Sequence, residues 1–274
     1  MASASGAVKT QVNYLGPMDE RPVFYAEATQ KNNLNLISHE VSVRDFRTRR
    51  DEASLETTGF TLVDHRTAVS DFKSSDQIDR LYIPEIRELI AGLTGAGKVM
   101  VSRPVLRWSE REAHPEMVNS RPGRFAHVDY DRQTFHGFAR THLAGDPEAD
   151  RWLLGRYAAF NIWRVMSAPP QDCPLGFIDR RTTAAGDIVE GDAVIDPKGR
   201  PEFRFSSSLY RASPRHRWGY FSDMRPDEAA VFLAYDSADD SLPGTPHSAF
   251  DDPSCPPGAP PRASCEIRAF AYWG

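Results

Sequence analysis

Cysteine is scarce in this chain of 274 residues, and its scarcity argues against two kinds of stabilising or binding site. The three cysteines are Cys173, Cys255 and Cys265, and no two of them form a CxxC pair. An odd number of widely spaced cysteines is not typical of a disulfide framework, and a zinc site ligated by cysteines needs paired spacing. We therefore expect neither feature.

Long hydrophobic runs and long basic runs are also missing. No stretch reaches the roughly 18 apolar residues that suggest a transmembrane helix, and the first residues lack the apolar segment of a secretory signal. The net charge is -5, and the RTRR cluster at residues 47–50 is the one basic group that stands out. We expect a cytoplasmic protein that binds neither membranes nor nucleic acid.

Two familiar catalytic patterns are absent or incomplete. The chain has no GxSxG elbow, so a serine hydrolase has no support. Residues 92–98 match the phosphate-binding pattern GxxxxGK, but Val99 replaces the Ser or Thr that would bind Mg²⁺. A helix is also expected before this segment, where the pattern requires a strand. We interpret the segment as a helix end followed by a turn, and a nucleotide-binding protein stays the weakest alternative.

The apolar pattern that is present indicates helices first and short strands afterwards. A helix is expected to begin at Ser75, with a kink at Pro84, and a second helix is expected over residues 146–160. The predicted strands cover residues 22–25, 59–64, 99–101, 160–165, 203–205, 217–221, 229–235 and 265–273. This order predicts a mainly β, jelly-roll core with helices on one side. We expect residues 1–274 to form one domain, with residues 1–60 as an N-terminal extension that packs on the core.

The first candidate for chemistry is the HxD motif formed by His127 and Asp129. On a strand, residues two apart point to the same face, so both side chains can reach one metal ion at roughly 2.0–2.2 Å. The motif alone is weak, because a surface Asp beside a half-buried His has the same spacing. It needs a third ligand from elsewhere in the chain.

The second candidate is the order His247, Arg262, Ser264 near the C-terminus. Two histidines and one carboxylate leave open positions on Fe(II), which a 2-oxo acid and O₂ can occupy. The far carboxylate of 2-oxoglutarate needs a buried cation, and the planar guanidinium of Arg262 matches it. Ser264 would face the same way and add a hydrogen bond. The alternative is that Arg262 caps a proline-rich loop and His247 is an ordinary loop histidine.

A competing distal pair is His216 with Arg225. His216 stands between two arginines, which disfavour a divalent metal, and Arg225 directly precedes a turn. We rank this pair second.

Several segments between residue 103 and the C-terminus resemble one known family. The matching segments are residues 126–129 (AHVD), 161–164 (NIWR), 216–221 (HRWGYF), 224–229 (MRPDEA), 235–237 (YDS), 245–253 (TPHSAFDDP) and 260–269 (PPRASCEIRA). Together they resemble the fungal hydroxylase/desaturase family, which includes gibberellin-desaturase-like and cephem-methoxylase-like proteins. The chain departs from the family at Val165, where Pro is common, and at Gly219, where an aromatic residue is common. These departures concern the substrate rather than the chemical class.

The resemblance implies a double-stranded β-helix (cupin-like) core and an Fe(II)/2-oxoglutarate-dependent dioxygenase. It places the iron ligands at His127, Asp129 and His247 and the 2-oxoglutarate clamp at Arg262, with Ser264 beside it. It also places four motif positions near the substrate pocket: Asn161, Trp163, Arg164 and Trp218. Their alternative role is that of core aromatics, an amide and a salt-bridged arginine.

The expected reaction uses Fe(II), 2-oxoglutarate and O₂ to remove hydrogen from a C–H bond of a small molecule through a ferryl species. Hydroxylation, desaturation or ring closure would follow, as in secondary-metabolite pathways. Two alternatives remain open from the sequence: an iron oxidase of the same fold that does not use 2-oxoglutarate, and a non-catalytic jelly-roll binding module. The sequence selects neither a substrate nor an oligomeric state.

Overall fold

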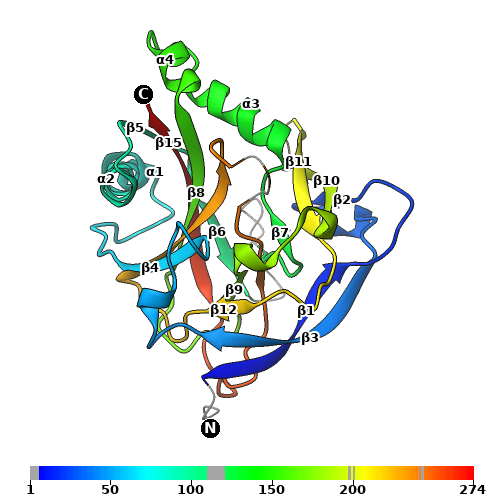
Figure 1. The fold of residues 1–274 in the computed structure, drawn as a ribbon. Coiled ribbons are helices and arrows are strands. Elements are labelled where there is room, and N and C mark those ends of the chain that lie inside the picture. Colours follow the sequence, from blue (N-terminus) through cyan, green and yellow to red (C-terminus); the bar gives the residue numbers. More distant parts are fainter. Residues whose placement is uncertain (1–5, 110–120, 197–198, 200, 240, 242–243) are drawn as a thin grey trace.

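Two β-sheets face each other in the computed structural model, which describes residues 6–109, 121–196, 199, 201–239, 241 and 244–274 (Figure 1). The larger sheet has nine strands in the order β1 (Ala7–Leu15), β3 (Leu36–Asp45), β12 (Trp218–Tyr220), β9 (Leu175–Ile178), β14 (His247–Ala249), β7 (His127–Val128), β11 (Phe203–Tyr210), β10 (Ile188–Ile195) and β2 (Val23–Tyr25). The smaller sheet has β4 (Phe60–Asp64), β13 (Glu228–Asp236), β8 (Arg156–Val165), β15 (Ala263–Trp273) and β5 (Lys98–Val101), and β6 (Val105–Trp108) pairs with the start of β15.

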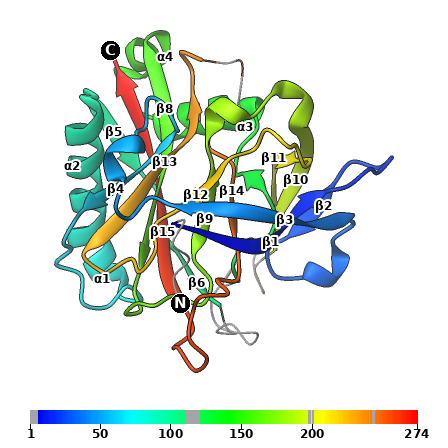
Figure 2. The same ribbon diagram turned by 60° about the horizontal axis from the view of Figure 1, so that its bottom comes forward.

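Residues 7–45 supply three strands of the larger sheet. β1 and β3 form an antiparallel pair, and β3 continues the sheet by pairing in parallel with β12. β2 pairs in parallel with β10 at the opposite edge. Figure 2 shows β1 and β3 crossing the molecule side by side beneath the shorter strands. The N-terminal segment is therefore hydrogen-bonded into the sheet that carries HxD.

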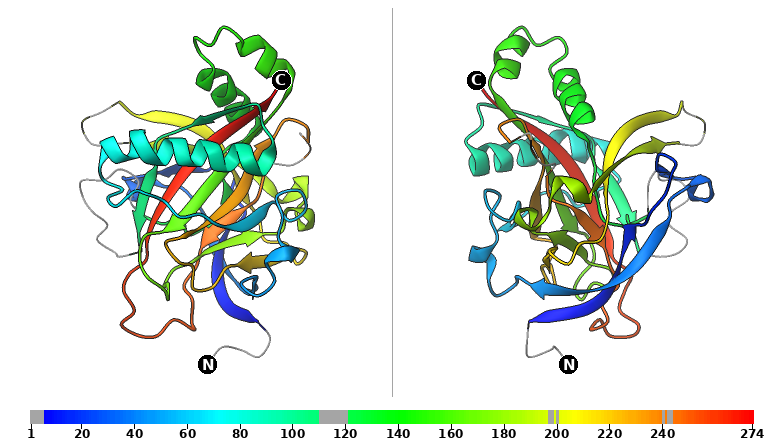
Figure 3. Two further views of the ribbon diagram at one scale, coloured as in Figure 1. Left: turned by 90° about the vertical axis from the view of Figure 1, so that its left-hand side faces the viewer. Right: turned by 45° about the vertical axis from the view of Figure 1, so that its right-hand side comes forward.

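A helical segment covers the outer face of the smaller sheet, as the left view of Figure 3 shows. It consists of α1 (Ser75–Gln77), a wider turn at Ile78–Tyr82, and α2 (Ile83–Thr94), and the Ser74 side chain caps it by accepting a hydrogen bond from the Gln77 amide. Ile86 and Ile90 pack against β15 and β5. Gly95 ends the helix with φ 68°, and Lys98 lies in β5, so the GxxxxGK segment is a helix end and turn as predicted.

The region after the HxD motif differs from the sequence prediction. α3 (Arg132–His142) was not predicted, although Asp131 caps it by accepting from the Thr134 amide. The helix predicted over residues 146–160 is wrong beyond α4 (Ala149–Leu154), because β8 begins at Arg156. Every residue of β8 after its first is buried, so the strand lacks the alternation that separates strands from helices. Among the described residues, no helix is long and apolar enough to cross a membrane.

Strand alternation divides each sheet into two faces. On β8, Phe160 and Ile162 pack outward against α2, whereas Trp163 packs inward with Phe177 and Phe232. The inner faces enclose a core that is rich in phenylalanine at one end. A cavity lined by residues of both sheets reaches His127 and Asp129.

Candidate metal centre and co-substrate site

The three predicted metal ligands come together on the inner face of the larger sheet. β7 supplies His127, Asp129 follows that strand directly, and His247 begins β14. His127 and His247 are paired across the two antiparallel strands, and their ring centroids are 4.5 Å apart. One potential ligand atom from each of the three residues lies within 4.8 Å of the others. The fold therefore brings together residues that are 120 positions apart in the chain.

Backbone carbonyls orient both imidazole rings. His127 Nδ1 lies 2.8 Å from the Phe125 carbonyl oxygen, and His247 Nδ1 lies 3.2 Å from the Thr245 carbonyl oxygen. Each Nδ1–H can donate to its carbonyl, which leaves the Nε2 lone pair for a metal. Burial, aided by the nearby His247, lowers the pKa of His127 to about 3. His127 is therefore neutral at physiological pH, the form that binds metal.

The two oxygens of Asp129 have different surroundings. Oδ2 accepts a hydrogen bond from Asn161 Nδ2 at 2.6 Å and another from Arg268 Nε at 2.9 Å. Oδ1 lies 3.7 Å from His127 Nε2. Burial by itself would raise the pKa of Asp129, but Arg268 and the two histidines hold it below its ordinary value. The carboxylate is therefore ionised and presents Oδ1 towards the histidines.

Arg262 and Ser264 carry polar atoms without partners, deep in the protein. Arg262 is 1% exposed, and neither its Nε nor its Nη2 has a hydrogen-bond acceptor within the described structure. The Ser264 hydroxyl, two residues along the same face of β15, is also buried and unpaired. Burial lowers the pKa of Arg262. An uncompensated buried cation is costly, so this arrangement suits a buried anion that accepts from both groups.

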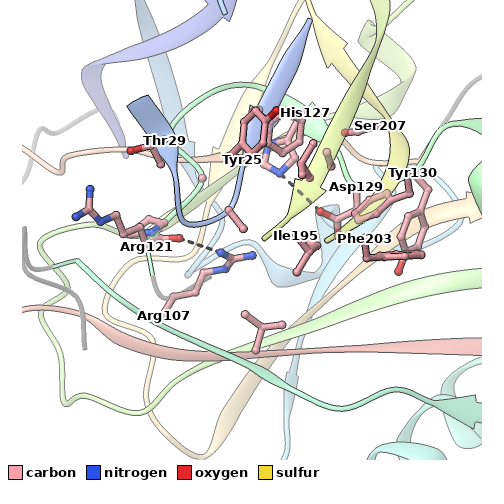
Figure 4. Close-up of a pocket in the computed structure, with 18 of the residues that line it drawn as sticks. Tyr25, Thr29, Arg107, Arg121, His127, Asp129, Tyr130, Ile195, Phe203 and Ser207 are labelled. Carbon is pink, nitrogen blue, oxygen red and sulfur yellow. Dashed lines mark hydrogen bonds and ion pairs between the residues drawn. The ribbon is translucent and has the colours of Figure 1, made fainter. Parts of the chain in front are cut away.

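A cavity of about 590 Å³ opens beside HxD. Figure 4 shows His127 and Asp129 on its wall, with Tyr130 and Phe203 close by and Arg107 across from them. Seven Phe and Tyr side chains from several elements line it: Phe24, Tyr25, Phe125, Tyr130, Phe138, Phe203 and Phe205. The cavity therefore has mainly apolar walls, with polar and charged side chains such as Arg107, Arg121 and Arg268 among them.

The four predicted pocket residues do not all reach the site. Asn161 bonds Asp129 directly, and Trp163 lies under the Arg262 guanidinium at 5.4 Å. Arg164 points to the outer face of the smaller sheet, where its Nε donates to Tyr82 Oη at 3.1 Å. Consecutive residues of a strand face opposite ways, so Trp163 and Arg164 cannot both face the interior.

Trp218 lies on the outer face of the larger sheet. Its indole donates to Tyr14 Oη at 2.8 Å, within a cluster on the face opposite the metal ligands. The competing ligand His216 belongs to the same region, 3.3 Å from Asp187, and Arg225 forms a surface ion pair with Asp227. The second-ranked pair, His216 and Arg225, therefore lies apart from His127 and Asp129.

Sequence reasoning missed Arg268 and the aromatic residues of β2. Arg268 contacts Asp129 and is the next inward-facing residue of β15 after Ser264 and Glu266. The two-residue period that paired Arg262 with Ser264 would have reached it. Nothing in the sequence indicated that β2 lies beside the cavity.

The comparisons with known proteins agree with this geometry. A family model described as an oxidoreductase/YMDC permease-like domain matches residues 12–272. The Fe(II)/2-oxoglutarate-dependent dioxygenase nvfI of Aspergillus novofumigatus is 30% identical over 247 residues, which cover 88% of this chain and 86% of the relative. The chain belongs to the fungal Fe(II)/2-oxoglutarate-dependent dioxygenases. The hydroxylase/desaturase CTB9 of Cercospora beticola is 29% identical over 252 residues, covering 85% of this chain and 76% of that one.

A solved structure supports the family at the level of the fold. The iron and alpha-ketoglutarate-dependent endoperoxidase NvfI superposes with a TM-score of 0.85 at 25% identity, covering 100% of both chains. The predicted family, the double-stranded jelly-roll fold and the dioxygenase class are therefore confirmed, together with Fe(II), 2-oxoglutarate and O₂ as the reactants of that class. Family membership disfavours the nucleotide-binding and non-catalytic alternatives. The roles of single residues stay predictions.

Proposed function

We propose that this dioxygenase oxidises an apolar small molecule of the secondary-metabolite type, with iron at His127, Asp129 and His247. Arg262 and Ser264 would bind the far carboxylate of 2-oxoglutarate. The observation that carries the proposal is the pair of buried, unpaired donors at the start of β15, with Arg262 over the inward-facing Trp163, together with the cluster of three possible ligands. A bidentate anion would satisfy donors that the described protein leaves unsatisfied.

The donor set fits the proposed metal. Two imidazoles and one carboxylate are the facial triad of non-haem Fe(II) oxygenases, and such a triad leaves positions open for co-substrate and O₂. Bound iron, 2-oxoglutarate and O₂ would supply the oxidising power for a C–H bond. The protein's own part is to hold the ligands through the Phe125 and Thr245 carbonyls, to neutralise the co-substrate with Arg262, and to keep bulk water out.

The cavity supports the substrate part of the proposal. Its volume of about 590 Å³ lies within the range of small-molecule sites, and aromatic walls favour a ring-containing, mostly apolar substrate. Relatives are named hydroxylase/desaturase and endoperoxidase, so hydroxylation, desaturation and oxygen insertion or ring closure are all compatible outcomes. We propose that a single domain performs this oxidation in the cytoplasm, which is consistent with the three free cysteines. We also propose that the protein has no nucleic-acid or membrane partner.

The experiment follows metal binding and co-substrate turnover separately. Purified protein with Fe(II) and 2-oxoglutarate should show visible charge-transfer absorption without oxygen, and should form succinate when ascorbate and air are added. His127→Ala and His247→Gln should lose both signals. His216→Gln, the matched control at the rival buried histidine, should keep them.

The opposite result has a clear meaning. If His216→Gln abolishes Fe(II) binding and His247→Gln does not, the ligand assignment is wrong. If Arg262→Ala leaves succinate formation intact at low 2-oxoglutarate, the co-substrate site lies elsewhere.

A further inference from the structure

Asp129 is held from the opposite sheet by two residues that are themselves paired. Asn161 on β8 and Arg268 on β15 are direct partners in the register of the smaller sheet. Both donate to Oδ2, at 2.6 Å and 2.9 Å. No described residue donates a hydrogen bond to Oδ1, the oxygen nearer His127. The carboxylate thus has one oxygen occupied by the protein and one left for the metal.

We propose that Arg268, supported by Asn161, is a positioning residue that restricts Asp129 to binding iron through Oδ1 alone. This rests on the proposed function. A carboxylate that is free to turn can chelate a metal through both oxygens and would take a fourth position. Two donors on Oδ2, one of them a permanent cation, oppose that rotation. The positions needed by 2-oxoglutarate and O₂ are thereby kept open.

The guanidinium of Arg268 is itself held in place. Its Nη2 donates to Glu266 Oε1 at 2.6 Å, which turns Nε towards Asp129. Its carbon centre lies 5.9 Å from the centroid of the Tyr130 ring. The side chain is only 19% exposed. Arg268 therefore acts from a fixed position rather than as a mobile surface charge.

The backbone of β15 would then fix the positions of the co-substrate donors and of the arginine that holds Asp129. Ser264, Glu266 and Arg268 alternate along the same face of β15, and Arg262 directly precedes the strand with the same two-residue spacing. Arg262 and Ser264 present unpaired donors for the co-substrate, and Arg268 contacts the metal ligand. Because the strand is rigid, the co-substrate clamp and the carboxylate clamp keep a constant spacing.

The test replaces Arg268 by Met and by Lys and uses Arg156→Met as the matched control. Arg156, on β8 of the same sheet, donates to Asp236 from Nε and Nη2, and it is not among the residues that line the cavity. Co(II) serves as a spectroscopic probe whose visible absorption reports its coordination. Arg268→Met should change the Co(II) spectrum and weaken 2-oxoglutarate binding to the Fe(II) protein about tenfold or more. Arg268→Lys should restore part of both, and Arg156→Met should leave the Co(II) spectrum unchanged.

Asn161→Ala gives an independent route if Arg268→Met does not fold, because it removes the other donor to Oδ2. The inference is overturned if folded Arg268→Met and Asn161→Ala proteins keep the parent's Co(II) spectrum. It is also overturned if Arg156→Met changes that spectrum as much as Arg268→Met does. A parent protein that binds Co(II) at the triad but never binds 2-oxoglutarate contradicts the proposed function, while the Co(II) comparison still decides the role of Arg268.

Discussion

Burying Arg262 costs free energy that no described hydrogen bond to its Nε or Nη2 offsets. Among the described residues, the Nε and Nη2 atoms of Arg262 have no hydrogen-bond acceptor; the guanidinium lies over the Trp163 ring, and Cys173 and Asp172 favour its charge from nearby. Such groups destabilise a protein until a ligand pairs with them. The folded chain therefore retains a residue that is unfavourable without an anion, which is the behaviour of a binding residue rather than a structural one.

This reasoning predicts opposite effects of Arg262→Met on stability and on binding. Without 2-oxoglutarate the variant should be at least as stable as the parent, because an apolar side chain replaces an unpaired buried charge. With 2-oxoglutarate it should lose about 1.5–3 kcal/mol of binding free energy, the worth of a charge-assisted hydrogen bond. Thermal unfolding with and without the co-substrate measures both quantities.

Ser264→Ala is the matched control at the neighbouring position. It should weaken 2-oxoglutarate binding less than Arg262→Met does, because a neutral hydroxyl contributes about 1 kcal/mol. A large loss of stability in ligand-free Arg262→Met would show instead that Arg262 is a structural residue of the β15 terminus.

The sequence predicted site residues that are related by their spacing within one strand. It did not show which residues of distant strands come into contact. His127 and Asp129 followed from strand periodicity, His247 from its place before Arg262 and Ser264, and Asn161 from the family motifs. Trp218 was misplaced because a motif does not show which face of a strand is inward. Arg268 could be found only by extending the alternation of β15 inward from Arg262.

Among the elements, a buried carboxylate explains the basic RTRR cluster. Arg47 and Arg50 both contact Glu228, the first residue of β13, whose side chain is 0% exposed. Arg225 adds its amide at 2.8 Å from Glu228 Oε2 and its guanidinium 3.1 Å from Oε1. Glu228 also stands opposite Asp64 in the β13–β4 register, so the arginines relieve a like-charge pair. These ion pairs connect the segment that follows β3 to β13 of the smaller sheet.

The cluster predicts a pH-dependent effect of Glu228→Gln. Burial would raise the pKa of Glu228, but hydrogen bonds from Arg47 and the Arg225 amide hold it below its ordinary value of 4.5. A lowered carboxyl pKa stabilises the fold above that value, and the contribution disappears as the pH falls through the folded pKa. At pH 7 the variant should lose about 2–3 kcal/mol of unfolding free energy, reduced from a fully buried pair because the arginines are partly exposed.

Urea unfolding of both proteins at pH 7 and below pH 4 measures this effect. The difference between them should shrink at the lower pH. A difference that stays constant would mean that shape, and not charge, accounts for the loss. Asp79→Asn, at an exposed ion pair with Arg103, is the control and should change stability little at either pH.

Helices and strands were predictable from the sequence where their apolar residues recur at a regular helical or strand spacing. The helix from Ser75 and strand β4 have such periods. β8 lacks one because both of its faces are buried, and the predicted helix over residues 146–160 absorbed its first half. Gly219 shows a further limit: a Cβ there would collide with Phe46 and approach Phe60, so these two rings already fill the space that an aromatic residue would take.

Across the whole molecule, the proposed metal centre lies where the two sheets meet. Its ligands belong to β7 and β14 of the larger sheet, whereas Asn161 and Arg268 reach Asp129 from β8 and β15 of the smaller one. Arg262 and Ser264 extend the co-substrate site further along β15. Neighbouring strands of each sheet are thus connected through one small cluster of polar side chains. Binding at this cluster should stabilise the molecule as a unit.

We therefore expect metal and co-substrate together to raise the thermal midpoint of the entire chain in a single transition. At 100 times the dissociation constant a ligand adds about 2.7 kcal/mol, which corresponds to roughly 5–10 °C for a domain of this size. Differential scanning calorimetry with Mn(II) and 2-oxoglutarate, against protein treated with a chelator, measures the shift. Hydrogen exchange should show the gain in protection on β7, β14, β8 and β15 alike, because the bound cluster joins both sheets. His127→Ala should abolish the shift, and protection confined to the larger sheet would show that the smaller sheet takes no part in binding.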